Sequence, residues 1–193
     1  YPPAVTELLG ALSAAAVLMQ GNIKFNGALV LQVFGDGPVK LAVTEVQPDF
    51  SFRTTATVNG EVADGVPLSH MVNVNGLGRC AITLDPKDRL PGQQPYQGVV
   101  PLNGEHNEKL EHLSEVLEHY MLRSEQLDTK LVLAANGEVA AGLLIQRLPA
   151  TGASNLAGSS AVQAQGDAIG ENEDYHRIAT LAASLKPEEL LTL

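Results

Sequence analysis

The stretch A-L-V-L-Q-V-F-G-D-G-P-V-K-L-A-V-T-E-V, residues 28–46, carries the clearest structural signal in the sequence. Two runs rich in apolar and β-branched residues flank Asp36-Gly37-Pro38, and Asp, Gly and Pro together mark a tight turn. Each run has the length of one strand. The stretch therefore predicts a β-hairpin at the start of an antiparallel meander.

Turn signals elsewhere extend this sheet. Asn-Gly dipeptides, which favour the two positive-φ positions of a type I′ hairpin turn, begin at residues 26, 59, 75, 103 and 136. They predict five such turns and much antiparallel sheet. Further strands are expected at residues 50–58, 79–84, 96–102, 130–135 and 139–148.

Two segments carry helical periodicity. Residues 3–20 and residues 106–126 each place apolar side chains on one stripe, with proline near the start of the first segment, where its missing N–H is harmless. A strand-dominated domain with packed helices belongs to the α+β class. We expect this α+β core to occupy residues 1–149.

The composition changes after the core. Residues 150–171 contain few large apolar residues and are expected to form a flexible linker. Residues 172–193 are expected to form short C-terminal helices, with Asn172 as an N-cap and Pro187 opening the last one. Ile178, Leu181 and Leu185, with Ala182, form a narrow apolar stripe that needs a partner surface.

Composition and charge exclude several classes of function. The 193 residues carry 22 acidic and 12 basic side chains, a net charge of −10, so a nucleic-acid partner is not expected. No run approaches the roughly 18 apolar residues of a membrane span, so no membrane partner is expected either. The single cysteine excludes an intrachain disulfide and is compatible with a reducing cytosol. The absent initiator methionine leads us to expect further residues before Tyr1.

The stretch N-G-L-G-R-C-A-I-T-L, residues 75–84, superimposes two candidate sites. Gly76, Gly78 and Ala81 form a relaxed G-x-G-x-x-A pattern, but a dinucleotide site needs a helix after the glycines and a strand is expected here. Cys80 shares its strand face with Ile82 and Leu84, so we expect a buried, unreactive thiol.

Other potential catalytic or metal ligands are weak. His112, Glu115 and His119 lie on the side of their predicted helix opposite its leucines, which indicates a solvated face and no metal site. Ser69 and His70 are neighbours that helical or strand geometry points in different directions, and no G-x-S-x-G motif occurs. No catalytic residue is assigned, and we do not expect an enzyme.

An ordered series of segments resembles the redox-regulated bacterial chaperones of the heat-shock protein 33 family. The series comprises G-N-I-K-F-N-G from residue 21, Q-V-F-G-D-G-P-V-K-L-A-V from 32, V-N-G-L-G-R-C-A-I-T-L from 74, Y-Q-G-V-V-P-L from 96, Y-M-L-R-S-E-Q-L-D-T-K-L from 120, A-G-L-L-I-Q-R-L-P from 141 and K-P-E-E-L-L-T-L from 186. Their order and spacing over the whole chain make the resemblance specific.

The resemblance implies an ATP-independent holdase that binds unfolding proteins under oxidative and heat stress, acts as a homodimer and resides in the cytoplasm. It also implies a switch in which oxidation expels zinc from a C-terminal cysteine domain and unfolds that domain and the linker helices. Those zinc cysteines are expected after Leu193, and Cys80 matches none of them. No zinc or other cofactor is therefore expected on this chain.

The client-binding surface is expected to be the surface that Ile178, Leu181 and Leu185 cover. Docking of these helices on the sheet should be only marginally stable, because ordering the tether costs about 1 to 2 kcal/mol for each fixed residue. We therefore expect the chain to suppress client aggregation without an oxidant.

Two alternatives remain open at this point. An enzyme or small-molecule-binding domain would assemble its site from scattered residues such as His70, Arg79 and Glu125, in a deep polar pocket. A purely structural dimerisation module would show a large apolar interface and no effect on clients.

Overall fold

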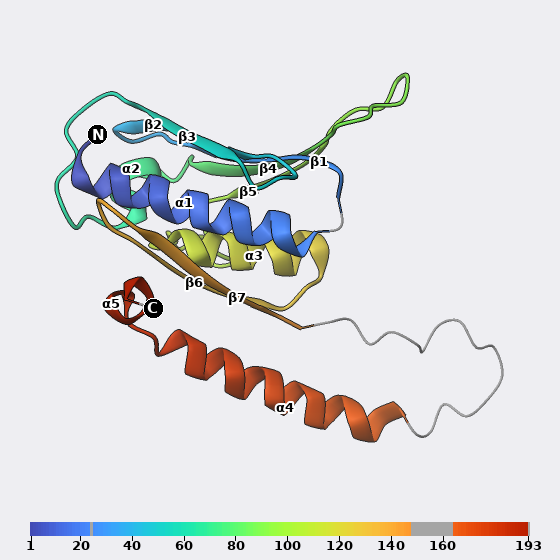
Figure 1. Ribbon diagram of the computed structural model, residues 1–193. Coiled ribbons are helices and arrows are strands. Elements are labelled where there is room, and N and C mark those ends of the chain that lie inside the picture. The colour runs from blue at the N-terminus through green and yellow to red at the C-terminus, as the bar shows by residue number, and fades with distance from the viewer. Residues whose placement is uncertain (24, 148–163, 193) are drawn as a thin grey trace.

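The computed structural model describes residues 1–23, 25–147 and 164–192. It has the predicted α+β architecture (Figure 1). The elements in chain order are α1 (Pro3–Asn22), β1 (Gly27–Phe34), β2 (Val39–Val46), β3 (Phe52–Val58), α2 (Leu68–Val72), β4 (Arg79–Pro86), β5 (Tyr96–Pro101), α3 (Leu113–Glu125), β6 (Thr129–Ala135), β7 (Ala140–Gln146), α4 (Ala164–Ala183) and α5 (Pro187–Leu191).

The predicted hairpin of residues 28–46 is confirmed and lies at the centre of the main sheet. β1 pairs with β2 in an antiparallel register that places Leu31 opposite Thr44 and Val33 opposite Ala42. Alternate residues of β1 point inward, and Leu29, Leu31 and Val33 are all 0% exposed. This alternation fixes which face of the sheet receives the helices.

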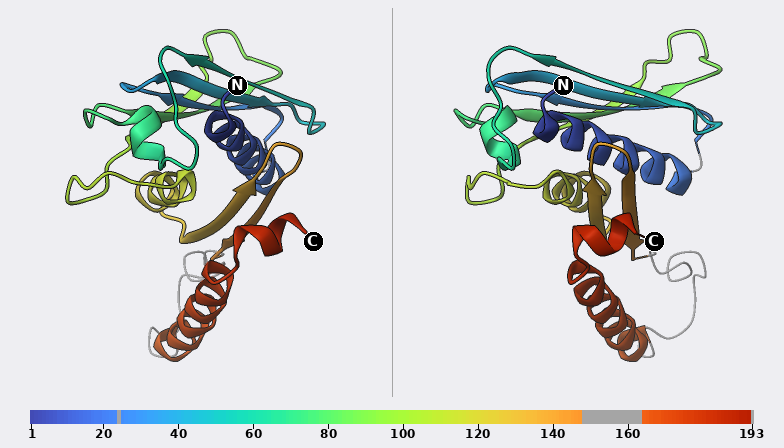
Figure 2. Two further views of the ribbon diagram at one scale, coloured as in Figure 1. Left: turned by 90° about the vertical axis from the view of Figure 1, so that its left-hand side faces the viewer. Right: turned by 60° about the vertical axis from the view of Figure 1, so that its left-hand side comes forward.

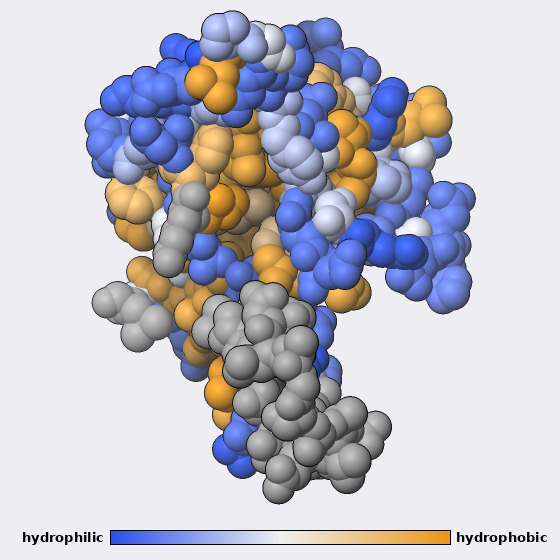
Figure 3. Space-filling view, turned by 90° about the vertical axis from the view of Figure 1, so that its right-hand side faces the viewer, coloured by the Kyte–Doolittle hydropathy of each residue, from blue (hydrophilic) through white to orange (hydrophobic). Residues whose placement is uncertain are grey.

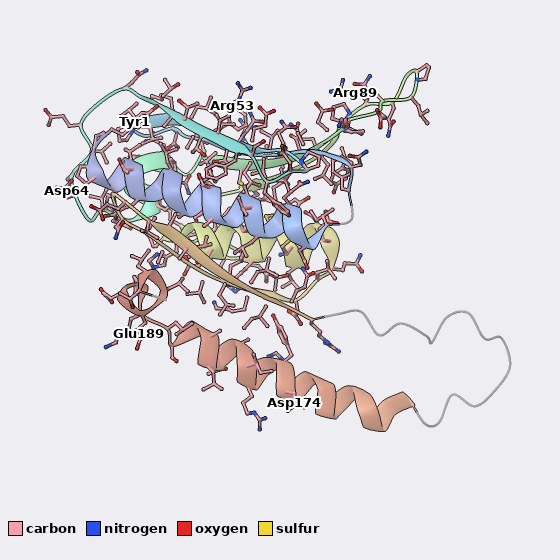
Figure 4. All side chains as sticks on the ribbon, in the orientation of Figure 1. Tyr1, Arg53, Asp64, Arg89, Asp174 and Glu189 are labelled. Atoms are coloured by element: carbon pink, nitrogen blue, oxygen red, sulfur yellow. The ribbon has the colours of Figure 1, made fainter. Side chains whose placement is uncertain are left out.

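The main sheet has five antiparallel strands in the order β3-β2-β1-β4-β5. The helices α1, α2 and α3 all lie on one side of it, and the other face carries no helix (Figure 1). Arg53 projects from that open face, where it forms a 3.0 Å ion pair with Glu45 (Figure 4). The core therefore lies between the sheet and its helices.

α1 is enclosed from two sides. It contacts β1, β2 and β3 above and the two-stranded hairpin β6–β7 below (Figures 1 and 2). A helix between two sheets needs apolar residues all round, and Glu7 is the one charged residue in α1. The Ser13 hydroxyl also lies 2.6 Å from the Thr54 hydroxyl of β3, which ties the helix to the sheet.

The length and composition of α1 would also suit a membrane span. Of the described helices, only α1 is long and apolar enough to cross a membrane, and 56% of its most apolar 18-residue stretch is buried inside the fold. Buried core helices of soluble proteins can be equally long and apolar. Here the apolar surface of α1 is used in packing between two β-layers.

Small residues allow this close packing. A Cβ placed on Gly10 would lie 2.6 Å from the Ala135 Cβ, and one placed on Gly142 would lie 2.7 Å from a Leu18 methyl carbon. Such distances are shorter than carbon atoms tolerate. Glycine at these two positions therefore sets the separation between α1 and the β6–β7 hairpin.

The type I′ prediction for the Asn-Gly dipeptides is wrong. Outside glycine, positive φ occurs in the described residues at Phe50, Asn107 and Gln126, so none of the five asparagines adopts it. Only Asn136-Gly137 joins two paired strands, β6 and β7. There the Asn136 side chain accepts the backbone N–H groups of Glu138 and Val139, at 2.8 and 2.7 Å, an alternative turn for asparagine.

Two helix starts also differ from the prediction. Residues 106–112 are not helical, because Leu110 donates its N–H to Leu102 and Glu111 accepts one from Leu68, so α3 begins only at Leu113. α4 begins at Ala164, inside the predicted linker, and Asn172 is not its cap. Adding a residue to an existing helix costs far less free energy than starting a new one. The residues before Asn172 therefore extend α4 towards its N-terminus. Residues 150–163 of the predicted linker lie outside the described residues.

We predict that Gly10→Ala destabilises the protein by about 1 to 3 kcal/mol, because the added methyl overlaps Ala135. Urea unfolding followed by circular dichroism measures this. The matched control is Gly21→Ala in the same helix, where the new Cβ would meet Phe50 at an ordinary 3.6 Å. That variant should be neutral or gain up to about 1 kcal/mol. Equal effects of both changes would contradict the close packing of α1 on the hairpin.

Candidate functional site

The hairpin β6–β7 is apolar on both faces. Leu131, Leu133 and Leu144 pack into the core beneath α1 and α3. Strand alternation then places Val132, Leu143 and Ile145 on the opposite face, with Val132 paired directly with Leu143. This second apolar face is the candidate functional surface, and we call it the outer hairpin face.

The C-terminal helices cover the outer hairpin face only in part. α4 contacts β6, and α5 contacts both β6 and β7, on the side away from α1 (Figure 1). Among the side chains described in these two helices, Ala182 and Leu190 are the buried ones, at 5% and 7% exposed. Val132, Leu143 and Ile145 stay half-buried beneath them. In the described part of the cover, few side chains are therefore buried.

The predicted stripe does not form the contact as expected. Ile178 is 48% exposed and Leu181 is 64% exposed, while Leu185 is half-buried. Ile178 and Leu181 are not covered here, because α4 turns a neighbouring side, which includes Ala182, towards the hairpin. Sequence periodicity identified an apolar stripe but not which edge of it would be covered.

Tyr175 of α4 marks where this helix meets the start of β6. Its side chain is half-buried. Burial, together with the nearby carboxylates of Asp128 and Glu118, raises the pKa of Tyr175, and Arg147 opposes that shift. The phenol thus remains neutral and packs as an apolar group beside these charges.

Glu118 of α3 secures the free edge of the hairpin. Its carboxylate accepts the backbone N–H of Leu131 at 2.8 Å and pairs with the Lys130 ammonium at 3.0 Å. An edge N–H that is bonded in this way is not offered to another strand. The Leu131 N–H is therefore not available for pairing with an added strand at this edge.

Sequence reasoning missed Leu190 and the outer hairpin face. A signal for the latter was present, since residues 131–135 and 140–145, L-V-L-A-A and A-A-G-L-L-I, are apolar without alternation. Continuous apolar strands are typical of sheets that are covered on both faces. No comparable signal singled out Leu190 from its neighbour Leu191.

The structure does not bring His70, Arg79 and Glu125 together. Arg79 pairs with Phe34 at one end of β4. Glu125 accepts the Tyr96 hydroxyl at 3.1 Å, and Tyr96 lies opposite Leu84 near the other end of the same strand. His70 is an exposed residue of α2. These three residues do not form one site.

A cavity of about 640 Å³ lies at the ends of β1, β2 and β4, and several charged side chains line it. Its carboxylates already have partners: Glu45 pairs with Arg53, and Asp85 with Arg89. The Ser51 hydroxyl and amide, which donate to Asp49, lower the pKa of that third carboxyl group. The lowered pKa of Asp49 is the opposite of the raised pKa that a general acid needs.

Cys80 and its neighbours serve structure. Gly76 has a φ of +76°, which a turn requires and glycine tolerates, and the strand β4 follows it, as predicted. Cys80 is 0% exposed, and burial raises the pKa of its thiol to about 12. The predicted burial of Cys80 is confirmed.

The histidine-containing segment adopts a structural role. Glu115 accepts the backbone N–H groups of Glu111 and His112, at 2.9 and 3.0 Å, so its carboxylate stabilises the start of α3. Ser69 donates its hydroxyl to Glu111 at 2.6 Å. Within residues 1–23, 25–147 and 164–192 there is no group of three or more His, Cys, Asp or Glu that could hold a metal ion. The described residues do not fit zinc.

Comparisons with known proteins identify relatives over the whole chain. The model of the Hsp33 protein family matches residues 1–193. Proteins named 33 kDa chaperonin are 42% identical in Chromobacterium violaceum, 41% in Methylobacillus flagellatus and 38% in Neisseria meningitidis serogroup A. Each match covers all of this chain but only 56%, 57% and 55% of the respective relative. The chain thus spans about half the length of these relatives.

A solved structure supports the fold. The crystal structure of a 33 kDa chaperonin from Thermotoga maritima aligns with 72% of this chain and 47% of its own, with a TM-score of 0.52 and 18% sequence identity. At this identity the likeness concerns the architecture. The predicted fold class is confirmed.

We predict that Leu190→Ser loosens α4 and α5, because it removes about 1.5 to 3 kcal/mol of apolar burial. Binding of a fluorescent apolar dye should increase as the outer hairpin face opens. The matched control is Leu181→Ser, the same change at a side chain that is already 64% exposed. If both variants bound the dye equally, Leu190 would not anchor the cover.

We predict that Cys80 of the native protein resists a thiol reagent at about pH 8, whereas the urea-unfolded chain reacts readily. The pKa shift also affects stability. The unfolded thiol ionises above its usual value of 9.0, whereas the native thiol keeps its proton to about pH 12. Relative to Cys80→Ala, the free energy of unfolding should therefore fall by up to about 1.4 kcal/mol per pH unit in this range. Rapid labelling of the folded protein would refute the burial.

Proposed function

Because the chain belongs to the Hsp33 protein family, we propose that the protein is an ATP-independent chaperone that binds unfolding proteins and prevents their aggregation. The names of the relatives support a chaperone function. The observation that carries the proposal is the outer hairpin face, an apolar surface under a cover whose described part buries few side chains. An apolar surface of this kind is what an unfolding client can bind.

In this proposal, α4 and α5 act as a reversible cover. While they are docked, they occupy the face that includes Val132, Leu143 and Ile145. Their release exposes these side chains, while α1 and α3 continue to support the hairpin from its other face. Leu190 is the one large side chain that the described part of the cover buries, so a few kcal/mol separate the two states.

We place the redox control of this cover outside residues 1–193. The family resemblance implies a zinc-binding cysteine domain, and Cys80 is unsuited to that role because its thiol is buried and its pKa is about 12. Redox chemistry elsewhere in a longer protein would act on this chain by releasing α4. The oxidative and heat-stress role of the proposal depends on that control.

Partners and location follow from the same resemblance. We infer a cytoplasmic homodimer whose partners are unfolded or oxidatively damaged proteins. The net charge of −10 opposes binding to nucleic acid. It also disfavours close contact with anionic lipid surfaces.

We predict that this chain reduces the aggregation of a heat-denaturing model enzyme without an oxidant and without ATP. Light scattering measures the effect against an inert protein at equal mass. Leu190→Ser should protect more strongly, because it exposes more of the outer hairpin face, and Leu181→Ser should match the parent chain. The proposal fails if the chain and its Leu190→Ser variant both protect no better than the inert protein.

A further inference from the structure

An apolar cavity of about 340 Å³ lies apart from the outer hairpin face. It opens where the C-terminal ends of α1 and α3 meet β4, β5 and the end of β7. Figure 3, which shows this side of the molecule, has a hollow with hydrophobic residues in and around it. The cavity is lined by Met19, Asn22, Ile23, Ile82, Leu84, Tyr96, Tyr120, Met121, Glu125, Leu127 and Gln146.

The cavity is built into the core. Met19, Ile82 and Tyr120 are each 2% exposed, so they form its floor. The ring of Tyr120 fits there only because Gly98 has no side chain: a Cβ at Gly98 would lie 2.6 Å from the Tyr120 ring. The floor is therefore fixed by the sheet and not by mobile surface side chains.

One carboxylate stands at the rim. Glu125 Oε1 accepts the Tyr120 hydroxyl at 2.9 Å and the Tyr96 hydroxyl at 3.1 Å. Burial, the hydrogen bonds to Tyr96 and Glu125 and the Glu125 charge raise the pKa of Tyr120, so its hydroxyl stays a donor. Both donors use the same oxygen, which leaves Glu125 Oε2 for a donor from outside.

The charge of the rim selects the ligand. Among the residues that line the cavity, Glu125 carries the one charged side chain, and the whole chain has a net charge of −10. The amide of Asn22 donates to Gln146 at 2.7 Å and adds uncharged polar groups to the rim. An apolar floor below a lone carboxylate suits a large apolar group with an adjacent cation.

We propose that this cavity anchors client segments in which a large apolar side chain neighbours a lysine or arginine. The apolar side chain fills the floor, and the neighbouring cation pairs with Glu125. This inference rests on the proposed chaperone function and names the class of client segment that the chain prefers. It also gives the Glu125 carboxylate a role in binding clients. The enzyme alternative would instead place this residue in a deep polar pocket.

The methionines provide a direct test. The chain has three: Met19 and Met121 line the cavity, and Met71 lies elsewhere, so it is an internal control. With ¹³C-methyl-labelled methionine, an unstructured peptide that carries a Phe-Lys pair should shift the Met19 and Met121 signals and leave Met71 unchanged. The same peptide with Phe-Glu should bind more weakly.

Glu125→Gln keeps an acceptor for both tyrosines and removes the charge. It should weaken binding of the Phe-Lys peptide by roughly three- to tenfold and should not weaken binding of the Phe-Glu peptide, which loses a like-charge repulsion. Glu188→Gln, the same change in net charge on exposed α5, is the matched control and should have no effect.

The outcomes separate this inference from the proposed function. Protection of a client without shifts at Met19 and Met121 overturns the cavity and leaves the chaperone function standing. Shifts at Met19 and Met121 without protection of a client overturn the chaperone function and leave peptide binding in the cavity standing. Equal binding of the Phe-Lys and Phe-Glu peptides, or equal effects of Glu125→Gln and Glu188→Gln, overturns the role of the carboxylate.

Discussion

The structure depends on a two-stranded hairpin that is apolar on both faces. Two strands alone are not stable in water, and β6–β7 pairs with no third strand among the described residues. Leu131 and Leu144 must be covered from one side, Val132 and Leu143 from the other. The helices α1 and α3 cover the hairpin on one side, and α4 and α5 cover it on the other.

The two covers are unequal. On the inner side α1 is packed between the hairpin and the main sheet, with glycine at position 10 to permit close approach. On the outer side, Ala182 and Leu190 are the side chains that the described parts of α4 and α5 bury, and Leu181 stays largely in solvent. The inner face of the hairpin is thus firmly covered by α1. The cover on the outer face can be released at a small cost in free energy. The proposed chaperone function draws on this difference between the two covers.

The parts of the fold that were predictable from sequence are those that local chemistry determines. Alternation and the Asp36-Gly37-Pro38 turn gave the central hairpin, and strand alternation placed Cys80 in the core. The type I′ prediction failed at Asn136 because its side chain accepts the N–H groups of Glu138 and Val139 and so forms a different local turn. The end of α3 was predicted well and its start was not, because residues 110 and 111 bond to Leu102, just after β5, and to Leu68 at the start of α2.

The candidate surface was less predictable, since it depends on which side of a helix faces which strand. The stripe Ile178, Leu181 and Leu185 indicated that α4 needs a partner, but not which side of the helix would face the hairpin. The cavity at Glu125 combines residues from α1, β4, β5, α3 and β7, and such a combination exists only after folding. Here the sequence contains the groups, and the topology decides which of them meet.

Native-state hydrogen exchange measured residue by residue tests the central claim most directly. If α4 and α5 form a separately opening cover, their amides exchange through an opening that costs several kcal/mol less than the opening of α1 and β1. Client binding should then protect the amides of β6 and β7 and further expose those of α4. If α4 and α1 exchanged with the same free energy of opening, the C-terminal helices would belong to one cooperative unit with the core, and the account would be contradicted.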